Sequence, residues 1–346
     1  MRSPKITVFM AAYNATAYIE ESISSILNQT FKDFELIIID DGSTDDTALV
    51  VKKFNDSRII FIQNDGNKGL PFTRNRLLEL ARGEYIAILD SDDIAYPERL
   101  QLQLNFFYSH PEVALCGGHG KIINENGIED EKKIIVPTND LISMHMLFGN
   151  PFINSSTMFK TQIFKELKGY RDFALAEDFD FFIRISEKYM VANIDAFLVK
   201  YRIHGENITI KRSEDQEQNE LEILKYLQQT LGMAFNINTL KMHKELLTNE
   251  IDETHLLGYL ELLVKMKIAN LASNRFDIIK MNKFLFNKWY EIISSKRSNL
   301  KALNFYFKKE LYSIEYFNFK QFRKIFKSSL RGLLTNFPPS ISFLFY

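Results

Sequence analysis

The sequence predicts an α/β protein with a mostly parallel sheet and flanking helices, followed by a C-terminal helical region. First, apolar runs of strand length alternate with segments of helical spacing through the first hundred residues, which is typical of β-α-β units. Second, long helical patterns dominate from about residue 213, where Gly and Pro nearly vanish. Third, 346 residues exceed what one compact core holds. We therefore predict two domains, residues 1–212 and 213–346.

The elements expected in the first domain follow in order. Residues 6–12 form an apolar run that is too short for a signal peptide, and we interpret it as a first buried strand. Residues 15–29 have helical spacing, and residues 34–39 lack polar alternation, which predicts a strand buried on both faces. The same reasoning predicts strands at 58–62, 85–89 and 113–117 and helices at 44–54, 71–81 and 97–108.

The pattern loosens beyond residue 117. A hairpin is expected within residues 121–137, with its turn at Asn126-Gly127. The remaining expectations are an extended segment at 151–160, helices at 161–166 and 178–189, and two strands within 191–202. Ligands of such sheets bind at the carboxyl ends of the strands, so the residues that follow each strand are the candidates for chemistry.

The composition of the chain limits which partners and which cellular compartment are expected. The net charge of -1 gives no general basic field and argues against nucleic acid as a partner. Cys116 is the only cysteine, so no internal disulfide can form and a reducing compartment fits. No uninterrupted apolar stretch reaches the length of a bilayer span. We expect a cytoplasmic protein.

Two aspartates follow the second expected strand. Gly42 and Ser43 come directly after Asp40 and Asp41, and by themselves they indicate a turn and a helix cap. Asp40, however, stands at the end of a buried strand. A carboxylate there can accept a hydrogen bond from a nucleobase N–H or a ribose hydroxyl.

A denser acidic cluster, Asp90-Ser91-Asp92-Asp93, follows the fourth expected strand. Like charges this close repel unless a cation or a donor lies between them. A divalent metal ion that also binds a diphosphate needs only one or two protein carboxylates, and an Asp-x-Asp at a strand end supplies them. The alternative is a solvated acidic turn before the next helix.

A third acidic group, Glu177 and Asp178, opens an expected helix, where acidic residues are also common because of the helix dipole. Phe179, Phe181 and Phe182 stand beside it. A carboxylate among aromatic side chains is partly desolvated, which raises its pKa and suits it to general-base work.

Basic residues accompany the acids. Arg74, which follows Asn67 along the chain, could reach a diphosphate from its expected helix, although a solvated helix arginine has the same sequence signature. Arg202 and His204 follow the last strand of the first domain, where a mobile loop could close over phosphates.

Together these segments resemble the family 2 glycosyltransferases, which are inverting enzymes with the GT-A fold. The resemblance rests on ordered motifs within residues 5–210, namely residues 8–14, 22–30, 39–45, 67–75 and 83–93 and the Glu177-Asp178 pair. One departure is Ala11, where members of the family often carry Pro. The resemblance does not extend beyond residue 212.

The resemblance implies how a UDP-sugar donor is held. The donor-binding residues that it implies are Ala11, Tyr13, Asp40, Asn67, Arg74, Asp90, Ser91 and Arg202. Among them, Tyr13 and Asp40 would hold the uracil, and Arg74 and Asp90 would face the ribose, diphosphate or sugar. Arg202 would belong to a basic loop that touches the diphosphate or the metal.

The resemblance also implies the chemistry. Asp92 and His204 would hold Mg²⁺ or Mn²⁺, and Asp178, with Glu177 beside it, would act as the base. The enzyme would transfer a hexose or N-acetylhexosamine to a hydroxyl of a saccharide or lipid-linked saccharide. The transfer would be a single displacement that inverts the anomeric configuration. Surface polysaccharide or glycolipid assembly is the role expected of the family.

Two alternatives belong to other functional classes. One is a nucleotide-sugar-binding module that kept the fold and lost activity, which turnover would distinguish. The other is a sugar-phosphate nucleotidyltransferase, which should show a glycine-rich loop after the first strand, and the segment Tyr13-Asn14-Ala15-Thr16 has no glycine.

The C-terminal region is basic between residues 296 and 331, where Glu310 and Glu315 are the only acids and aromatic residues interleave with the cations. A basic, aromatic amphipathic helix can lie on an anionic membrane surface, which would place the protein on the inner face of the cytoplasmic membrane. The alternative is an ordinary helical bundle with an aromatic core and solvated lysines.

Overall fold

The computed structural model describes residues 3–173, 176–205, 214–294 and 302–335. The chain divides into two compact units, Met1–Asn219 and Glu220–Tyr346, and each is described by itself. The boundary expected at residue 212 lies outside the described residues.

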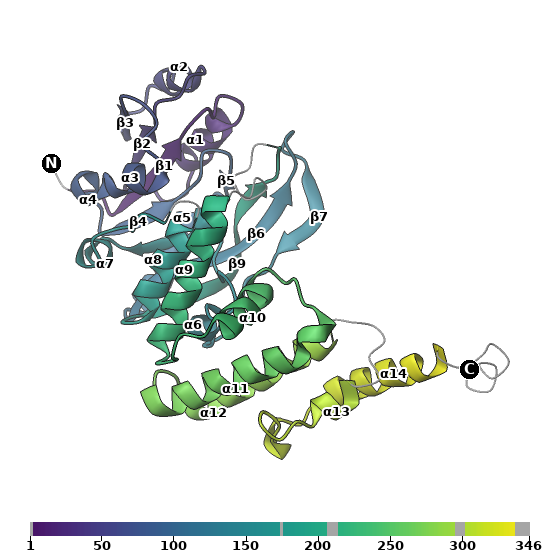
Figure 1. Ribbon diagram of the computed structural model, residues 1–346. Coiled ribbons are helices and arrows are strands. Elements are labelled where there is room, and N and C mark those ends of the chain that lie inside the picture. Colours follow the sequence, from purple (N-terminus) through teal and green to yellow (C-terminus); the bar gives the residue numbers. More distant parts are fainter. Residues whose placement is uncertain (1–2, 174–175, 206–213, 295–301, 336–346) are drawn as a thin grey trace. The chain divides into compact units, whose positions relative to one another are not determined.

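The first unit contains a nine-stranded sheet with flanking helices (Figure 1). Its strands are β1 Ile6–Ala12, β2 Phe34–Asp40, β3 Ile59–Gln63, β4 Tyr85–Ile88, β5 Ile94–Ala95, β6 Val113–Ile123, β7 Glu129–Ile134, β8 Met158–Lys160 and β9 Met190–Arg202. Their order across the sheet is β3-β2-β1-β4-β8-β6-β9-β5, and β7 pairs with β6.

One half of the sheet is parallel, as predicted. Strands β3, β2, β1 and β4 pair in parallel, with Ala12 of β1 opposite Asp40 of β2. Every residue of β2 is buried, which agrees with its unbroken apolar sequence. The carboxyl ends of these strands therefore meet at one edge of the sheet, and the expected site residues follow them.

The other half departs from the prediction in two ways. Strand β8 runs antiparallel between β4 and β6, so it interrupts the parallel order. The segment expected as two strands within 191–202 is one strand, β9, whose pairing with β6 shifts register along its length. The hairpin expected at Asn126-Gly127 is present, since β6 and β7 pair around it.

Helices cover both faces of the sheet. They are α1 Ile19–Leu27, α2 Thr47–Lys52, α3 Leu70–Asn75, α4 Leu77–Leu80, α5 Arg99–Ser109, α6 Ile142–His145, α7 Thr161–Glu166 and α8 Glu177–Ser186. Apolar residues of α1 and α5 pack with alternate residues of β1, β2 and β4 in one core. On the other face, Phe159 of β8 contacts Phe181 of α8 with 5.2 Å between ring centroids. The helix expected at 71–81 is two short helices that meet at Arg76.

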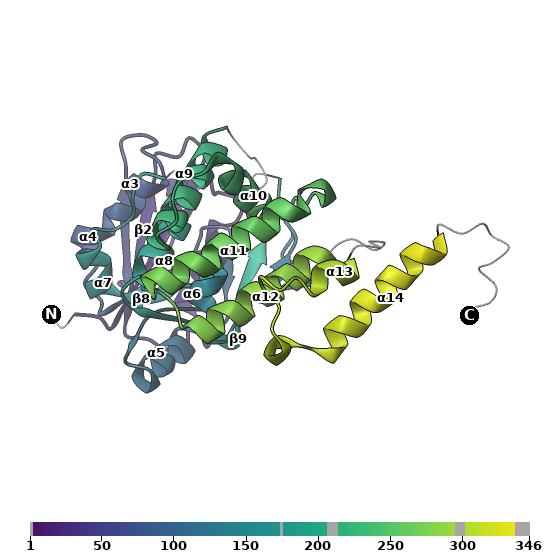
Figure 2. The same cartoon turned by 60° about the horizontal axis from the view of Figure 1, so that its bottom comes forward.

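Helices make up the C-terminal region, as the sequence predicts. They are α9 Glu214–Thr230, α10 Ile237–Leu247, α11 Leu256–Ser273, α12 Ile278–Ser294, α13 Ala302–Tyr306 and α14 Phe319–Thr335 (Figure 2). Trp289 is fully buried here and donates its indole N–H to the Phe305 carbonyl at 2.8 Å. In the described parts of the chain, no helix is both long enough and apolar enough to span a bilayer.

Candidate active site

Hydrogen bonds join the loop that follows β1 to the loop that follows β2. Tyr13 follows β1 with 47% of its surface exposed, and Ala11 lies partly buried within the strand. Asn14 adopts a positive φ of 51°, and its Oδ1 accepts a hydrogen bond from the Thr44 backbone N–H at 2.9 Å. An exposed tyrosine ring is thus presented beside the carboxyl edge of the sheet, where a flat base can stack on it.

Asp40 is fully buried and organises the turn after β2. Its Oδ1 accepts from the Ser43 backbone N–H at 2.9 Å, and its Oδ2 accepts from the Gln63 amide at 2.9 Å. Gly42 has a φ of +75°, and a Cβ there would lie 2.4 Å from the carbonyl carbon of Gly66. Only glycine lets these two backbones approach so closely.

Asp41 holds the loop after β3 and was not singled out from the sequence. Its carboxylate accepts from the backbone N–H groups of Lys68 and Gly69 at 3.0 and 2.9 Å. Asn67 lies exposed in the same loop, and its side chain accepts a second bond from the Gly69 N–H at 3.0 Å. The doubled aspartate at the strand end was the signal that could have identified Asp41.

Asp90 follows β4 and receives hydrogen bonds from a distant segment. Asn154 Nδ2 donates to both carboxylate oxygens at 3.0 Å, and Ser155 Oγ donates to Oδ2 at 2.8 Å. Arg74 Nη2 lies 3.4 Å from Oδ1. Asn154 and Ser155 were missed by sequence reasoning, because their segment carries no charge and no regular pattern.

Asp92 and His204 come together next to Asp90. His204 Nε2 lies 3.0 Å from Asp92 Oδ2. Between the two aspartates, the carbonyl of Ser91 accepts a hydrogen bond from Ser22 Oγ of α1 at 2.9 Å. Burial, and then the negative charge of Asp90, raise the pKa of Asp92 against the opposing hydrogen bond from His204.

The Asp92–His204 pair suits a divalent cation that is shared with a diphosphate. Where the chain is described, no group of three or more His, Cys, Asp or Glu side chains is placed to hold a metal alone. Mg²⁺ and Mn²⁺ need only one or two protein donors when phosphates and water complete the coordination. A carboxylate and an imidazole in contact, with Asp90 nearby, meet that need.

Arg202 is buried at the end of β9. Its backbone N–H donates to Asp93 Oδ1 at 2.8 Å, and its Nε donates to the Asp92 carbonyl at 2.8 Å. Its guanidinium also pairs with Glu21 of α1 and lies 4.7 Å from the centre of the Tyr18 ring. These contacts give Arg202 a structural role in fixing the loop that carries Asp92.

Arg74 is buried between two carboxylates, so the alternative of a solvated helix arginine is wrong. Its guanidinium forms an ion pair with Glu177 at the start of α8, approaches Asp90, and lies 5.5 Å from the centre of the Tyr170 ring. Burial disfavours its charge, but Glu177 and then Asp90 outweigh burial and raise the pKa of Arg74. A permanent positive charge therefore stands within the acidic cluster.

Several buried polar atoms around Arg74 have no hydrogen-bond partner among the described residues. They are Arg74 Nε, Asn154 Oδ1, Tyr170 Oη and Glu177 Oε2. Buried polar groups are almost always paired in native proteins. Hydrogen-bonding capacity is therefore left unused at one place beside Asp90.

Asp178 lies beside Glu177, and its pKa is close to neutral pH, as a general base requires. Its Oδ1 accepts from the Phe179 backbone N–H at 2.7 Å, and Asn150 Nδ2 lies 3.4 Å from its Oδ2. Burial, and then the negative charge of Glu177, raise the pKa of Asp178 to about 6 against the opposing charge of Arg74. The direction agrees with the sequence-based expectation of a desolvated base.

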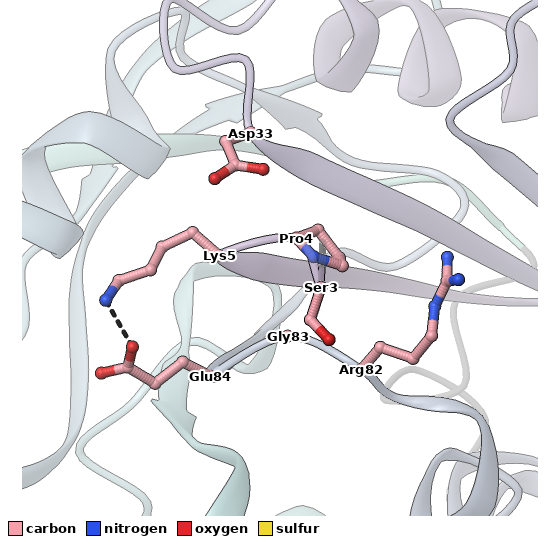
Figure 3. A pocket seen from close by; sticks show the side chains of 7 residues that line it. All are labelled: Ser3, Pro4, Lys5, Asp33, Arg82, Gly83 and Glu84. Atoms are coloured by element: carbon pink, nitrogen blue, oxygen red, sulfur yellow. Dashed lines mark hydrogen bonds and ion pairs between the residues drawn. The ribbon is translucent and has the colours of Figure 1, made fainter. Parts of the chain in front are cut away.

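A separate hollow of about 330 Å³ lies at the opposite edge of the sheet (Figure 3). Its lining residues are Ser3, Pro4, Lys5, Asp33, Arg82, Gly83 and Glu84. Lys5 pairs there with Glu84 (Figure 3). Arg82 pairs with Glu35. Because open α/β sheets bind ligands at the carboxyl ends of their strands, we do not place the active site in this hollow.

Comparison with known proteins identifies the class. The pattern of glycosyl transferase family 2 matches residues 7–167. An uncharacterized glycosyltransferase of Methanocaldococcus jannaschii is 38% identical over 223 residues, which cover 63% of this chain and 77% of the relative. An uncharacterized glycosyltransferase of Haemophilus influenzae is 30% identical over 349 residues, which cover 95% of this chain and 98% of the relative. The chain therefore belongs to glycosyl transferase family 2, and it is a glycosyltransferase.

Other similar proteins carry more specific names. The UDP-Glc:alpha-D-GlcNAc-diphosphoundecaprenol beta-1,3-glucosyltransferase of Escherichia coli is 31% identical over 212 residues, which cover 61% of this chain and 81% of the relative. The structure of Staphylococcus aureus TarS with UDP-GlcNAc has a TM-score of 0.56 at 19% identity, covering 95% of this chain and 92% of that one. The Pyrobaculum calidifontis mannosyltransferase with GDP-Man and Mn²⁺ has a TM-score of 0.51 at 15% identity, covering 97% and 89%. These structural likenesses show the GT-A fold.

Proposed function

We propose that the protein is an inverting glycosyltransferase that moves a hexose or N-acetylhexosamine from a UDP-sugar to a hydroxyl of a lipid-linked saccharide. Its product would serve in surface polysaccharide or glycolipid assembly. The E. coli relative is named for a UDP-glucose donor and a diphosphoundecaprenol-linked acceptor, which supports this substrate pair. The observation that carries the proposal is Asp178, whose pKa of about 6 makes it a usable base beside Arg74.

The donor would lie along the carboxyl edge of the sheet. The exposed Tyr13 ring would stack on the uracil, with Ala11, Asp40 and Asn67 lining the base pocket. Asp40 is buried, so it would act there mainly by shaping the turn after β2.

Arg74 and Asp90 would contact the diphosphate and the donor sugar. The Asp90 side chain is 35% exposed, and Arg74 Nη2 lies 3.4 Å from its Oδ1. A fixed arginine charge stabilises negative charge that develops on a leaving diphosphate without further reorganisation. Asp92 and His204 would hold Mg²⁺ or Mn²⁺, which supplies additional neutralisation of the diphosphate.

Asp178 would take the proton from the acceptor hydroxyl as that oxygen attacks the anomeric carbon. The new bond joins the acceptor oxygen to the anomeric carbon, and the bond from that carbon to the diphosphate breaks, with its electron pair leaving on the diphosphate. A single displacement of this kind inverts the anomeric configuration. Glu177 and Arg74 position Asp178 and tune its basicity.

The proposal is tested by the stereochemistry of the product and by Asp178→Asn. With an α-linked UDP-sugar and a diphosphate-linked GlcNAc acceptor, NMR of the product should show a β-linkage. Asp178→Asn should lower kcat by about 10²–10⁴-fold while UDP binding, measured by calorimetry, stays intact. Asp130→Asn, an exposed aspartate of β7, is the matched control and should remain active. An α-linked product, or near-normal transfer by Asp178→Asn, would contradict the mechanism.

A further inference from the structure

Helix α14 packs against its unit with one side only. On that side Ile325 is 1% exposed and Ser329 is buried. Gln321 donates a hydrogen bond from its side chain to Asn287 Oδ1 of α12 at 3.0 Å. The helix is therefore docked on the helical unit through a defined face.

Next to this buried side, α14 presents phenylalanine to solvent. Phe319 and Phe326 are seven residues apart, so they lie on one side of the helix, and they are 67% and 43% exposed. Phe317, 40% exposed, precedes the helix and contacts Phe322 with 5.7 Å between ring centroids. We call Phe317, Phe319 and Phe326 the phenylalanine ridge. Exposed aromatic side chains that lie together indicate a surface that binds another molecule or a membrane.

A basic stripe runs beside the phenylalanine ridge. It consists of Lys320, Arg323, Lys324 and Lys327, all of which are exposed and spaced at three or four residues. The sequence has no Asp or Glu between residues 316 and 335, so no acid of this segment neutralises the stripe. The exposed face of α14 is therefore apolar along one line and cationic along the next.

We propose that this face of α14 binds the anionic surface of a lipid bilayer. The phenylalanine ridge enters the boundary between headgroups and acyl chains, and the basic stripe lies level with the lipid phosphates. Apolar burial and attraction to anionic lipid are the two signals that such binding requires together. This inference goes beyond the proposed transfer reaction and does not depend on it.

Charge argues against the other occupants of this face. A second copy of the chain, related by a two-fold axis, would set one basic stripe against another, and these would repel. A duplex nucleic acid would attract the stripe through its phosphates, but its bases are stacked on one another and are not free to pack on the phenylalanine ridge. A membrane with anionic lipid satisfies both halves of the face at once.

The test is flotation of the full chain with vesicles at low salt. The protein should float with vesicles of phosphatidylcholine and phosphatidylglycerol and much less with phosphatidylcholine alone. Lys320→Gln with Lys324→Gln should weaken binding to the anionic vesicles roughly thirtyfold. Phe319→Ser with Phe326→Ser should weaken it about tenfold or more.

Matched controls change the same chemistry elsewhere in the helical unit. Lys241→Gln with Lys283→Gln removes two exposed cations, and Leu257→Ser with Ile279→Ser removes side chains that are 65% and 68% exposed. Both controls should float like the unmodified protein, and all variants should hydrolyse donor at the same rate. Two outcomes would overturn the proposal. One is that the protein does not float with anionic vesicles, or that the α14 variants float as well as the unmodified protein. The other is that Phe319→Ser with Phe326→Ser abolishes self-association or RNA binding but leaves flotation unchanged.

Discussion

At the residue scale, the environment of Asp178 determines what that carboxyl group can do. Its folded-state pKa of about 6 exceeds the ordinary value of 3.8, so the folded protein holds this proton more tightly than the unfolded chain does. The contribution of Asp178 to stability is therefore favourable below about pH 4 and is lost as the pH rises through about 6. At neutral pH the buried charge of Asp178 therefore lowers the stability of the fold, a cost that the proposed role of Asp178 as base would explain.

The raised pKa of Asp178 predicts the pH dependence of transfer. The base must be deprotonated, so kcat/KM should rise tenfold per pH unit below a pKa of about 6 and reach a plateau above it. Initial rates at saturating metal and low donor concentration, from about pH 5 to pH 8, measure this profile. A flat profile across that range, with the protein folded throughout, would rule out Asp178 as the titrating base.

At the element scale, the site exists because helices α3 and α8 meet across the edge of the sheet. Arg74 comes from α3 and Glu177 from the first turn of α8, and they form a buried ion pair. Residues 103 positions apart in the chain are thereby fixed against each other. Asp90 joins the same cluster from the end of β4.

Breaking this ion pair should destabilise the protein strongly. Arg74→Ala leaves Glu177 buried without its partner and should lower the free energy of unfolding by about 3–5 kcal/mol. The double variant Arg74→Met with Glu177→Leu should recover most of that stability and still lack transferase activity. Lys188→Ala, which breaks an exposed pair with Glu166, is the control and should change the stability by about 1 kcal/mol or less. Urea unfolding gives these values, and a double variant as unstable as Arg74→Ala would refute the pairing argument.

The same elements show what the sequence could and could not predict. Strand β2 and the acidic loops after β2 and β4 were predictable, because continuous apolar runs and clustered carboxylates are local signals. The insertion of β8 between β4 and β6 was not, because pairing between distant strands leaves no local pattern. Asn154 and Ser155 were missed because their segment carries no charge and no regular pattern. The burial of Arg202 was not predictable either, because burial is not visible in a loop sequence.

At the scale of the whole molecule, the two proposed tasks fall in different units of the chain. The carboxylates and Arg74 of the candidate site belong to the first unit, and the phenylalanine ridge and basic stripe belong to the second. The net charge of -1 conceals this division, because acidic and basic clusters cancel in the sum. Partners are therefore better inferred from local charge than from composition.

The most direct test of the central claim is nucleoside diphosphate release from a panel of UDP-, GDP- and dTDP-sugars, with Mn²⁺ or with EDTA. A metal-dependent glycosyltransferase should release nucleotide from one donor by slow hydrolysis even without acceptor. EDTA should abolish that release, and Asp92→Ala should lower it on the order of 10²-fold. No release and no nucleotide binding with any donor would contradict the account and favour a binding module that has lost its activity.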